Sequence, residues 1–358
     1  MRPSEPAASG RVSLVGLRLA ARTLGLRYWL AAFGVIAWLV DLRNQLVDIP
    51  LDLMADGLSY AAGGRHLLAG EAIYAPFQLA GPYGLGAAAL GQGFVYPPTA
   101  ALLFVPLAPL DTAGLLVVFG AAWALFGLLT YRLGVRSGLG PKWAAALAVV
   151  VAFSGPAING AVSGNANLIL ADALLASWLW PGSAGVLAVL GGAIKIFPVA
   201  GLIWTLRKGR SLVLPVALGV GIIVAATIVV GIPGWRDFIT TFEHGRTSSG
   251  YFLSSPAEAL GPLIGPIAGY GLALAAALGA WRVRNEAVAF ALLGWAMILP
   301  APDWYSHYLV VPLASMLPWI VGKLVLAAPI RGQWSGLSRA RLSRRRPNSA
   351  EIENSPTA

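Results

Sequence analysis

Residues 112–131 read TAGLLVVFGAAWALFGLLTY, an unbroken apolar run without a charged side chain. A helix needs roughly 20 predominantly apolar residues to cross the hydrocarbon core of a bilayer. The run is continuous and does not alternate apolar with polar residues, so it does not have the pattern of a membrane β-strand. It therefore predicts a transmembrane helix.

The rest of the chain repeats this pattern. The 358 residues are 57% hydrophobic and 11% charged, whereas a soluble domain carries roughly 25% charged residues. An all-α, polytopic transmembrane bundle of about ten membrane helices follows from the number of apolar runs. These runs lie near residues 28–40, 95–110, 112–131, 143–161, 166–180, 184–206, 212–232, 258–281, 286–300 and 307–328. The absence of cysteine excludes disulfides and thiolate-ligated metals.

The net charge is +10, and the basic residues cluster next to the ends of the apolar runs. Cytoplasmic loops of membrane proteins carry such an excess of Lys and Arg. Attraction to anionic lipid headgroups explains the same charges, so we expect no nucleic acid as a partner. The basic clusters are Arg2–Arg27, Arg132–Lys142, Arg207–Arg210, Arg282–Arg284 and Arg331–Arg346.

The order of the segments predicts three parts. Residues 1–27 form a basic cytoplasmic arm, and residues 28–328 form the transmembrane domain, beginning with an uncleaved first span. Within that domain, residues 41–110 make a first outer loop with surface helices. Residues 329–358 are Arg-, Ser- and Pro-rich and predict a disordered cytoplasmic tail. Both termini are then cytoplasmic, in a multi-pass protein of the cell membrane.

Two topologies fit the apolar runs. In the first, every basic loop faces the cytoplasm because residues 95–110 lie along the outer surface and residues 184–206 turn back near Lys195. Prolines at the start of the former run, and glycines and Pro198 in the latter, favour this scheme. In the second, both runs cross and the cluster Arg132–Lys142 lies outside. Both schemes place residues 41–95, 233–257 and 302–307 on the outer side.

The outer segment before Tyr96 gathers five of the fifteen acidic residues: Asp41, Asp48, Asp52, Asp56 and Glu71. Asp56 opens the string DGLSYAAGG (56–64), which predicts a short surface helix. Asp56 and Tyr60 would lie one turn apart on one face, so Tyr60 would orient the carboxylate or touch a substrate. Asp52 lies one turn earlier, and neighbouring carboxylates raise one another's pKa. The alternative is an acid that only satisfies free amides at the helix start.

Lys195 and Asp172 are ionisable residues inside apolar runs. A lysine at the bilayer centre costs about 2.5–3.5 kcal/mol, so a partner is required. A bound phosphate would serve, and so would an ion pair with Asp172; the two are compatible. Asn165 and Asn167 either bind a ligand or cap the following helix. Trp304 suits both a ligand contact and an interfacial anchor.

Several short motifs occur in a recognisable order. They are Asp56-x-x-x-Tyr60 with two glycines, Leu68-Ala-Gly70-x-x-x-Tyr74, Tyr96-Pro97-Pro98, Phe104-x-Pro106-Leu107, Gly164-Asn165-Ala166-Asn167-Leu168, Ile194-Lys195-x-x-Pro198 and Pro302-Asp303-Trp304-Tyr305-Ser306-His307-Tyr308. Together they resemble glycosyltransferase family 87, whose members are membrane enzymes of the GT-C class. The resemblance covers roughly residues 40–325. It departs from the family pattern at Asn165, where glutamine is usual, and in the loop around His307.

The resemblance implies a GT-C fold and inverting transfer of a sugar, with mannose expected, from a polyprenyl phosphate to a hydroxyl of a lipid or glycan on the outer membrane face. Asp56 would be the general base. Substrate contacts would come from Tyr60, Tyr96, Asn165, Asn167, Lys195, Trp304 and His307. No cofactor is expected, and no metal cluster is apparent in the sequence. The alternative function is a secondary transporter or lipid flippase that uses Asp172 and Lys195 along a translocation path.

Overall fold

The structure is a computed structural model, and it describes residues 43, 53–81, 83–84, 93–246, 260–301 and 305–327. The predicted basic arm, first span and C-terminal tail lie outside these residues, as do Asp52 and Trp304. The elements with their bounds are α2 (Ala55–Ala69), α3 (Pro76–Ala80), β1 (Tyr83–Gly84), α4 (Pro98–Leu103), η2 (Val105–Leu107), α5 (Thr112–Arg136), α6 (Pro141–Ala152), α7 (Gly155–Ser163), α8 (Ala166–Leu179), α9 (Ala184–Ile194), η3 (Phe197–Gly201), α10 (Leu202–Arg207), α11 (Val213–His244), β2 (Gly245–Arg246), α13 (Gly261–Arg282), α14 (Glu286–Ile298), η4 (Ser306–Leu309) and α15 (Val310–Ala327).

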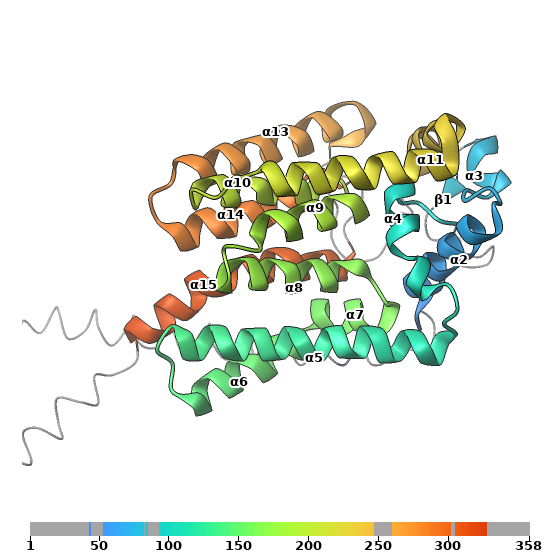
Figure 1. Cartoon of the computed structure of the whole chain (residues 1–358). Helices are drawn as coiled ribbons and strands as arrows, with labels where there is room; N and C mark the ends of the chain where they lie inside the picture. The colour runs from blue at the N-terminus through green and yellow to red at the C-terminus, as the bar shows by residue number, and fades with distance from the viewer. Residues whose placement is uncertain are drawn as a thin grey trace, which may run out of the picture.

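Helices make up this structure, as the sequence predicts, apart from the two-residue parallel pair β1–β2. Figure 1 shows the helices α5, α8, α11, α13 and α15 running roughly parallel, with the short helices α2, α3 and α4 gathered at one end of the bundle. Neighbours in the chain pack as hairpins, notably α5 with α6, α13 with α14, and α14 with α15. The short helices at one end are therefore supported by a bundle of long ones.

Several helices are long and apolar enough to cross a membrane, which confirms a multi-pass membrane protein. In the described residues there are four, or five if the bent pair α6–α7, with its 57° bend, is one span. Helices α8, α9 and α14 are apolar but shorter. The predicted number of about ten membrane helices is not reached within these residues and stays a prediction. The four long helices cover Thr112–Arg136, Val213–His244, Ile264–Arg282 and Ser306–Leu326.

Residues 95–110 do not form a spanning helix, in agreement with the first topology. They fold into the six-residue helix α4 and the 3-10 turn η2. Pro98 stands at the first helical position of α4, where its missing N–H costs nothing. Pro106 lies in the 3-10 turn that follows. Both pieces are far shorter than the roughly 20 residues that a bilayer crossing requires.

Residues 184–206 turn back on themselves, which also agrees with the first topology. Helix α9 ends at Lys195, whose backbone is extended at φ −136° and ψ 117°. A Cβ added at Gly201 would lie 2.9 Å from that of Ala188, and one added at Gly191 would lie 3.0 Å from that of Pro198. The outgoing and returning arms are thus antiparallel and in close contact. We call this unit the 184–206 hairpin, and Lys195 lies at its tip.

The three basic clusters within the described residues, Arg132–Lys142, Arg207–Arg210 and Arg282–Arg284, share one end of the bundle, as the first topology requires. Arg207, at the end of α10, donates to the carbonyls of Ala280, Trp281, Val283 and Arg284 at the end of α13. Next to it, Lys208 pairs with Glu286 at 2.6 Å. Arg136, at the end of α5, donates to Leu179 O at the end of α8. In Figure 1 these helix ends lie opposite the end that holds α2, α3 and α4.

Helix α11 differs from its prediction. The expected span 212–232 continues as helix to His244, so the first half of the predicted outer loop 233–257 is helical. The continuation is kinked at Gly231, which has φ 65° and ψ −179°. Pro233 follows and cannot donate to the carbonyl four residues earlier. The sequence signals for a helix end were correct locally, but the chain resumes its helix after the kink.

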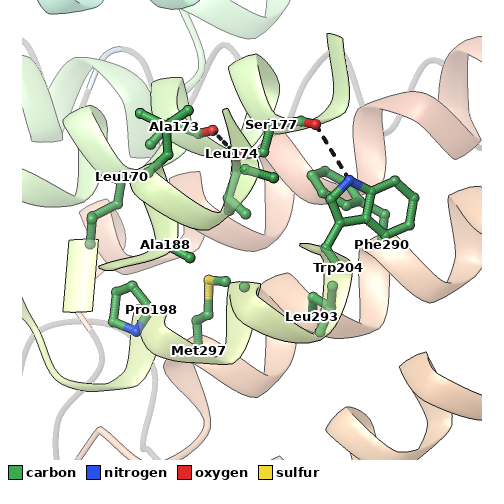
Figure 2. A pocket seen from close by; sticks show the side chains of 13 residues that line it. Leu170, Ala173, Leu174, Ser177, Ala188, Pro198, Trp204, Phe290, Leu293 and Met297 are labelled. Carbon is green, nitrogen blue, oxygen red and sulfur yellow. Dashed lines mark hydrogen bonds between the residues drawn. The ribbon is translucent and has the colours of Figure 1, made fainter. Parts of the chain in front are cut away.

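A small apolar pocket lies between α8, α14 and the 184–206 hairpin (Figure 2). Leu170, Pro198 and Met297 are among its lining residues, and Trp204 closes it by donating from Nε1 to Ser177 O at 3.4 Å. Its volume of about 20 Å³ admits at most one water. This pocket is a gap in the packing and has no room for a sugar.

Candidate functional site

Asp56 lies in the first turn of α2, on the surface of the end that holds the short helices. Its position is fixed by Met54, a residue with the unusual left-handed φ of 56° whose N–H donates to Val162 O at 2.7 Å. Gly57 and Gly164 allow the two segments to touch, since a Cβ on Gly164 would lie 3.1 Å from the Gly57 nitrogen. The half-buried carboxylate is also close to the positive end of the α2 dipole.

Asn165 connects Asp56 to the bundle. It is the N-cap of α8, and its Oδ1 accepts from the Asn167 backbone N–H at 2.8 Å. Its Nδ2 donates to Asp56 Oδ2 at 2.7 Å and contacts His307 Nε2 at 3.0 Å. Asn165 is therefore both a helix cap, as the simpler interpretation had it, and a direct partner of the proposed base. It is only 2% exposed, so it lies beneath the site surface.

His307 is also buried below the site. Its Nδ1 lies 2.8 Å from Asn159 Oδ1. One face of the imidazole stacks on Tyr305, with ring centroids 5.5 Å apart and planes at 6°. The histidine thus contacts Asn165 directly and Asp56 through it, while Tyr305 is half-buried and closer to the surface.

Tyr60 and Tyr96 form a hydrogen-bonded pair beside Asp56. The backbone N–H of Ala166 donates to the Tyr60 hydroxyl at 3.2 Å, and that hydroxyl donates to Tyr96 Oη at 3.0 Å. Burial, followed by the Asp56 charge, raises the pKa of Tyr60 well above its usual value. Burial, then Tyr60 and Asp56, raises that of Tyr96 as well. Both phenols therefore stay protonated and act as donors.

Lys195 lies at the same end of the bundle, at the hairpin tip. Its Nζ donates to Asn167 Oδ1 at 3.0 Å. It also lies over the rings of Tyr308 and Tyr96, 4.5 Å and 5.4 Å from their centroids, within the range of cation–π attraction. Asp56 is close enough to act on its charge. The structure therefore brings the carboxylate, the ammonium and a phenol together.

The ion pair of Lys195 with Asp172, one of two partners expected from the sequence, is wrong. The ion pairs seen between described residues include His66–Glu71 and Lys208–Glu286, and none joins Lys195 to Asp172. Asp172 is buried in α8, and its Oδ1 has no hydrogen-bond partner within the described chain. The residue that bonds to Lys195 is instead Asn167, which lies more than one turn closer to the start of α8.

The structure separates the predicted site residues into two layers. Half-buried Asp56, Tyr96 and Lys195 border the site surface. The buried residues beneath them are Tyr60, Asn165, Asn167 and His307. Tyr60 bonds to Tyr96 and Ala166, and these bonds replace the predicted orienting bond to Asp56.

Sequence reasoning missed Asn159, Tyr305 and Tyr308, which contact His307 or Lys195. The signal for Asn159 was a lone amide inside the apolar run 143–161. No group of three His, Asp or Glu suited to a metal occurs in the parts of the chain that the structure describes.

Comparison with known proteins identifies the family of this chain. Residues 94–312 match the family model of glycosyltransferase family 87, which is more than half of the chain. The chain belongs to glycosyltransferase family 87. The matched segment of this family 87 member contains Tyr96, Asn165, Asn167, Lys195 and His307, and begins after Asp56.

A similar characterised protein carries the name polyprenol-phosphate-mannose-dependent alpha-(1-2)-phosphatidylinositol mannoside mannosyltransferase and comes from Mycobacterium tuberculosis. It is 27% identical over 359 aligned positions, which cover 88% of this family 87 chain and 80% of the relative. No solved structure matches the chain.

Proposed function

We propose that this family 87 protein transfers a sugar, with mannose expected, from a polyprenyl phosphate to a hydroxyl of a lipid or glycan. The observation that carries the proposal is the half-buried carboxylate of Asp56, which is held by Asn165 beside Lys195 and Tyr96. The polyprenol-phosphate-mannose dependence in the name of the mycobacterial relative supports the choice of donor.

The proposed reaction inverts the anomeric centre. The acceptor hydroxyl attacks the anomeric carbon while Asp56 takes its proton, and the bond from that carbon to the phosphate oxygen breaks. The polyprenyl phosphate leaves with the electron pair of that bond. Lys195 and the Tyr96 hydroxyl would stabilise its negative charge, because preorganised donors at a developing charge lower the barrier. Tyr60 would act on the phosphate through Tyr96.

The buried amides and imidazole have a supporting role in this scheme. Asn165 holds the carboxylate, Asn167 holds Lys195, and His307 holds Asn165. Trp304 remains a proposed substrate contact beside Tyr305. We further propose the GT-C fold, with residues 28–328 as the catalytic domain and 41–110 as its first outer loop. The basic end of the bundle would face the cytoplasm, as would both termini, and Asp56 would face the outside of the cell membrane.

The transporter or flippase alternative gains no support from these contacts. It relied on Lys195 and Asp172 along one path, yet Lys195 bonds to Asn167, and Asp172 makes no ion pair in the described chain. The position of Lys195 near Asp56 fits an enzyme site, where the ammonium can act on the same substrate as the carboxylate. The glycosyltransfer reaction is therefore the function we infer.

The test is Asp56→Asn in purified protein given labelled polyprenyl-phosphate mannose and envelope lipid. Asparagine keeps the size and one acceptor oxygen for Asn165 but cannot take a proton. General base catalysis contributes about 10²–10⁴-fold, so transfer should fall by at least 100-fold. Glu71→Gln is the matched control, because Glu71 is an exposed acid of the same outer segment paired with His66; it should keep wild-type turnover. Substantial turnover by folded Asp56→Asn would remove the base assignment.

A further inference from the structure

Four side chains from distant parts of the chain form one line of hydrogen bonds that ends at Asp56. Asn159 in α7 contacts His307 in η4 at 2.8 Å, His307 contacts Asn165 at 3.0 Å, and Asn165 contacts Asp56 at 2.7 Å. Asn159 is 148 residues from His307 in sequence. Such a line costs conformational entropy to assemble.

The direction of every bond in the line follows from the cap of α8. A backbone N–H only donates, so the Asn165 atom that receives the Asn167 N–H is its oxygen. The Asn165 NH₂ group then faces Asp56 and His307, and each neighbour receives one of its two hydrogens. His307 Nε2 is therefore an acceptor without a hydrogen. The ring hydrogen must be on Nδ1, where it is donated to the Asn159 oxygen.

Burial and a nearby ammonium both disfavour a positive charge on the His307 ring. The ring is buried, and Lys195 lies close enough to disfavour a second positive charge there. Asp56 is the opposing charge, and it is separated from the ring by the Asn165 amide. Tyr305 and Tyr308 cover the imidazole without adding charge, at 5.5 Å and 5.2 Å between ring centroids. A neutral ring has two tautomers, and only the Nδ1–H form accepts from Asn165.

We propose that Asn159 is a positioning residue for the sugar transfer proposed above, and that it stabilises the Nδ1–H tautomer of His307 that Asn165 requires, by accepting the Nδ1 hydrogen. With a hydrogen on Nε2, the ring would oppose the Asn165 NH₂ group and push it out of line with Asp56. The carboxylate would then lose the donor that fixes its orientation toward the acceptor hydroxyl. Asn159 touches no substrate in this scheme; it acts through His307 and Asn165.

The first test reads the tautomer directly and does not depend on activity. The full-length protein in lipid bilayers is labelled with ¹⁵N-histidine, which marks His66, His244 and His307. In the wild type His307 should be a neutral Nδ1–H ring, and its signal is assigned by its loss in His307→Gln. This difference is needed because His66 and His244 also direct Nδ1 at an acceptor oxygen, of Glu71 and of the Gln78 backbone. Asn159→Ala should convert that signal to the Nε2–H form or a mixture, and Asn159→Asp should restore it, because a carboxylate also accepts from Nδ1. If His307 carried its hydrogen on Nε2 in the wild type, the proposal would be overturned even if no variant folded.

The second test reads turnover. Residues that orient metal-bound histidines contribute about 10–100-fold, and we expect the lower end for a histidine that orients a base, so Asn159→Ala should lower kcat by about ten-fold, with both KM values within about two-fold. Asn159→Asp should recover most of the rate. Asn285→Ala is the structural control, since Asn285 caps α14 at the other end of the bundle; it should lower stability and leave kcat unchanged.

An unchanged kcat in Asn159→Ala, or a loss seen only in KM, would refute positioning. By contrast, a wild-type protein that transfers no sugar would refute the proposed function, and the tautomer would still decide whether Asn159 controls His307.

Discussion

Replacing Lys195 by methionine is the sharpest test of how the donor is held. Methionine has a similar length and removes the ammonium, so the hairpin tip keeps its volume. The hydrogen bond to Asn167 Oδ1 at 3.0 Å is lost, together with the attraction to the Tyr308 and Tyr96 rings. These contacts exist without substrate. The effect on catalysis therefore depends on what the ammonium does for the phosphate.

The expected size follows from a charge-assisted hydrogen bond in a half-buried site. Hydrogen bonds to charged groups contribute about 1.5–3 kcal/mol, and each 1.4 kcal/mol is about ten-fold. Donor kcat/KM should therefore fall by about 10- to 100-fold. The loss should fall mainly on the donor, because the acceptor hydroxyl approaches the Asp56 side.

The assay varies labelled polyprenyl-phosphate mannose at a fixed acceptor concentration, and then the reverse. Lys208→Met is the matched control. Lys208 follows the 184–206 hairpin at the opposite end of the bundle, where its Nζ lies 4.6 Å from the centroid of a Trp204 ring and donates to Glu286. It should leave both kinetic constants within about two-fold of wild type. A donor kcat/KM within three-fold of wild type in Lys195→Met, or an equal loss for the acceptor, would refute the phosphate role.

Two further substitutions test the packing and the alternative function. Gly164→Val should lower the unfolding free energy by about 1–3 kcal/mol, because Gly164 has φ 70° and its added Cβ would lie 3.0 Å from Met54 Sδ. Thermal unfolding measures this loss. Gly271→Ala is the control, since a Cβ at Gly271 would meet no atom within 4 Å. Asp172→Asn should keep transfer within about two-fold of wild type and unfold at the same or a higher temperature. It replaces a buried ionisable carboxyl, whose Oδ1 has no partner in the described chain, by an amide of the same size that cannot become charged. A folded Asp172→Asn protein without transfer would favour a translocation path instead.

The non-spanning runs could be predicted because their residues conflict with a membrane helix. Pro97 and Pro98 open one run, and Gly191, Lys195 and Pro198 interrupt the other. The positive-inside count required the same two exceptions independently. The local backbone preferences and the placement of the basic loops therefore gave the same topology. The structure has both the short helix α4 and the reversal at Lys195.

Contacts between distant helices could not be predicted in the same way. Lys195 and Asp172 were paired because each was ionisable inside an apolar run. Asp172 lies five residues beyond Asn167 on α8, which is roughly 7.5 Å along the axis and about 140° around it. The hairpin tip meets the start of α8, so Asn167 is within reach and Asp172 is not. Asn159 was overlooked for a related reason: its partner, His307, is far away in sequence.

The position of Lys195 also bears on which function the fold can perform. If residues 184–206 crossed the bilayer, Lys195 would lie near its centre, where an ammonium costs about 2.5–3.5 kcal/mol and where a translocation path would need it. The turn at Lys195 instead brings it to the end of the bundle where α8 begins and Asp56 lies. There the ammonium meets an amide oxygen, two aromatic faces and a carboxylate. The same turn places Arg207 beside the end of α13. One reversal of the chain thus separates a basic end from the end that holds the proposed site, an arrangement that suits an enzyme acting at one membrane surface better than a carrier that must open to both.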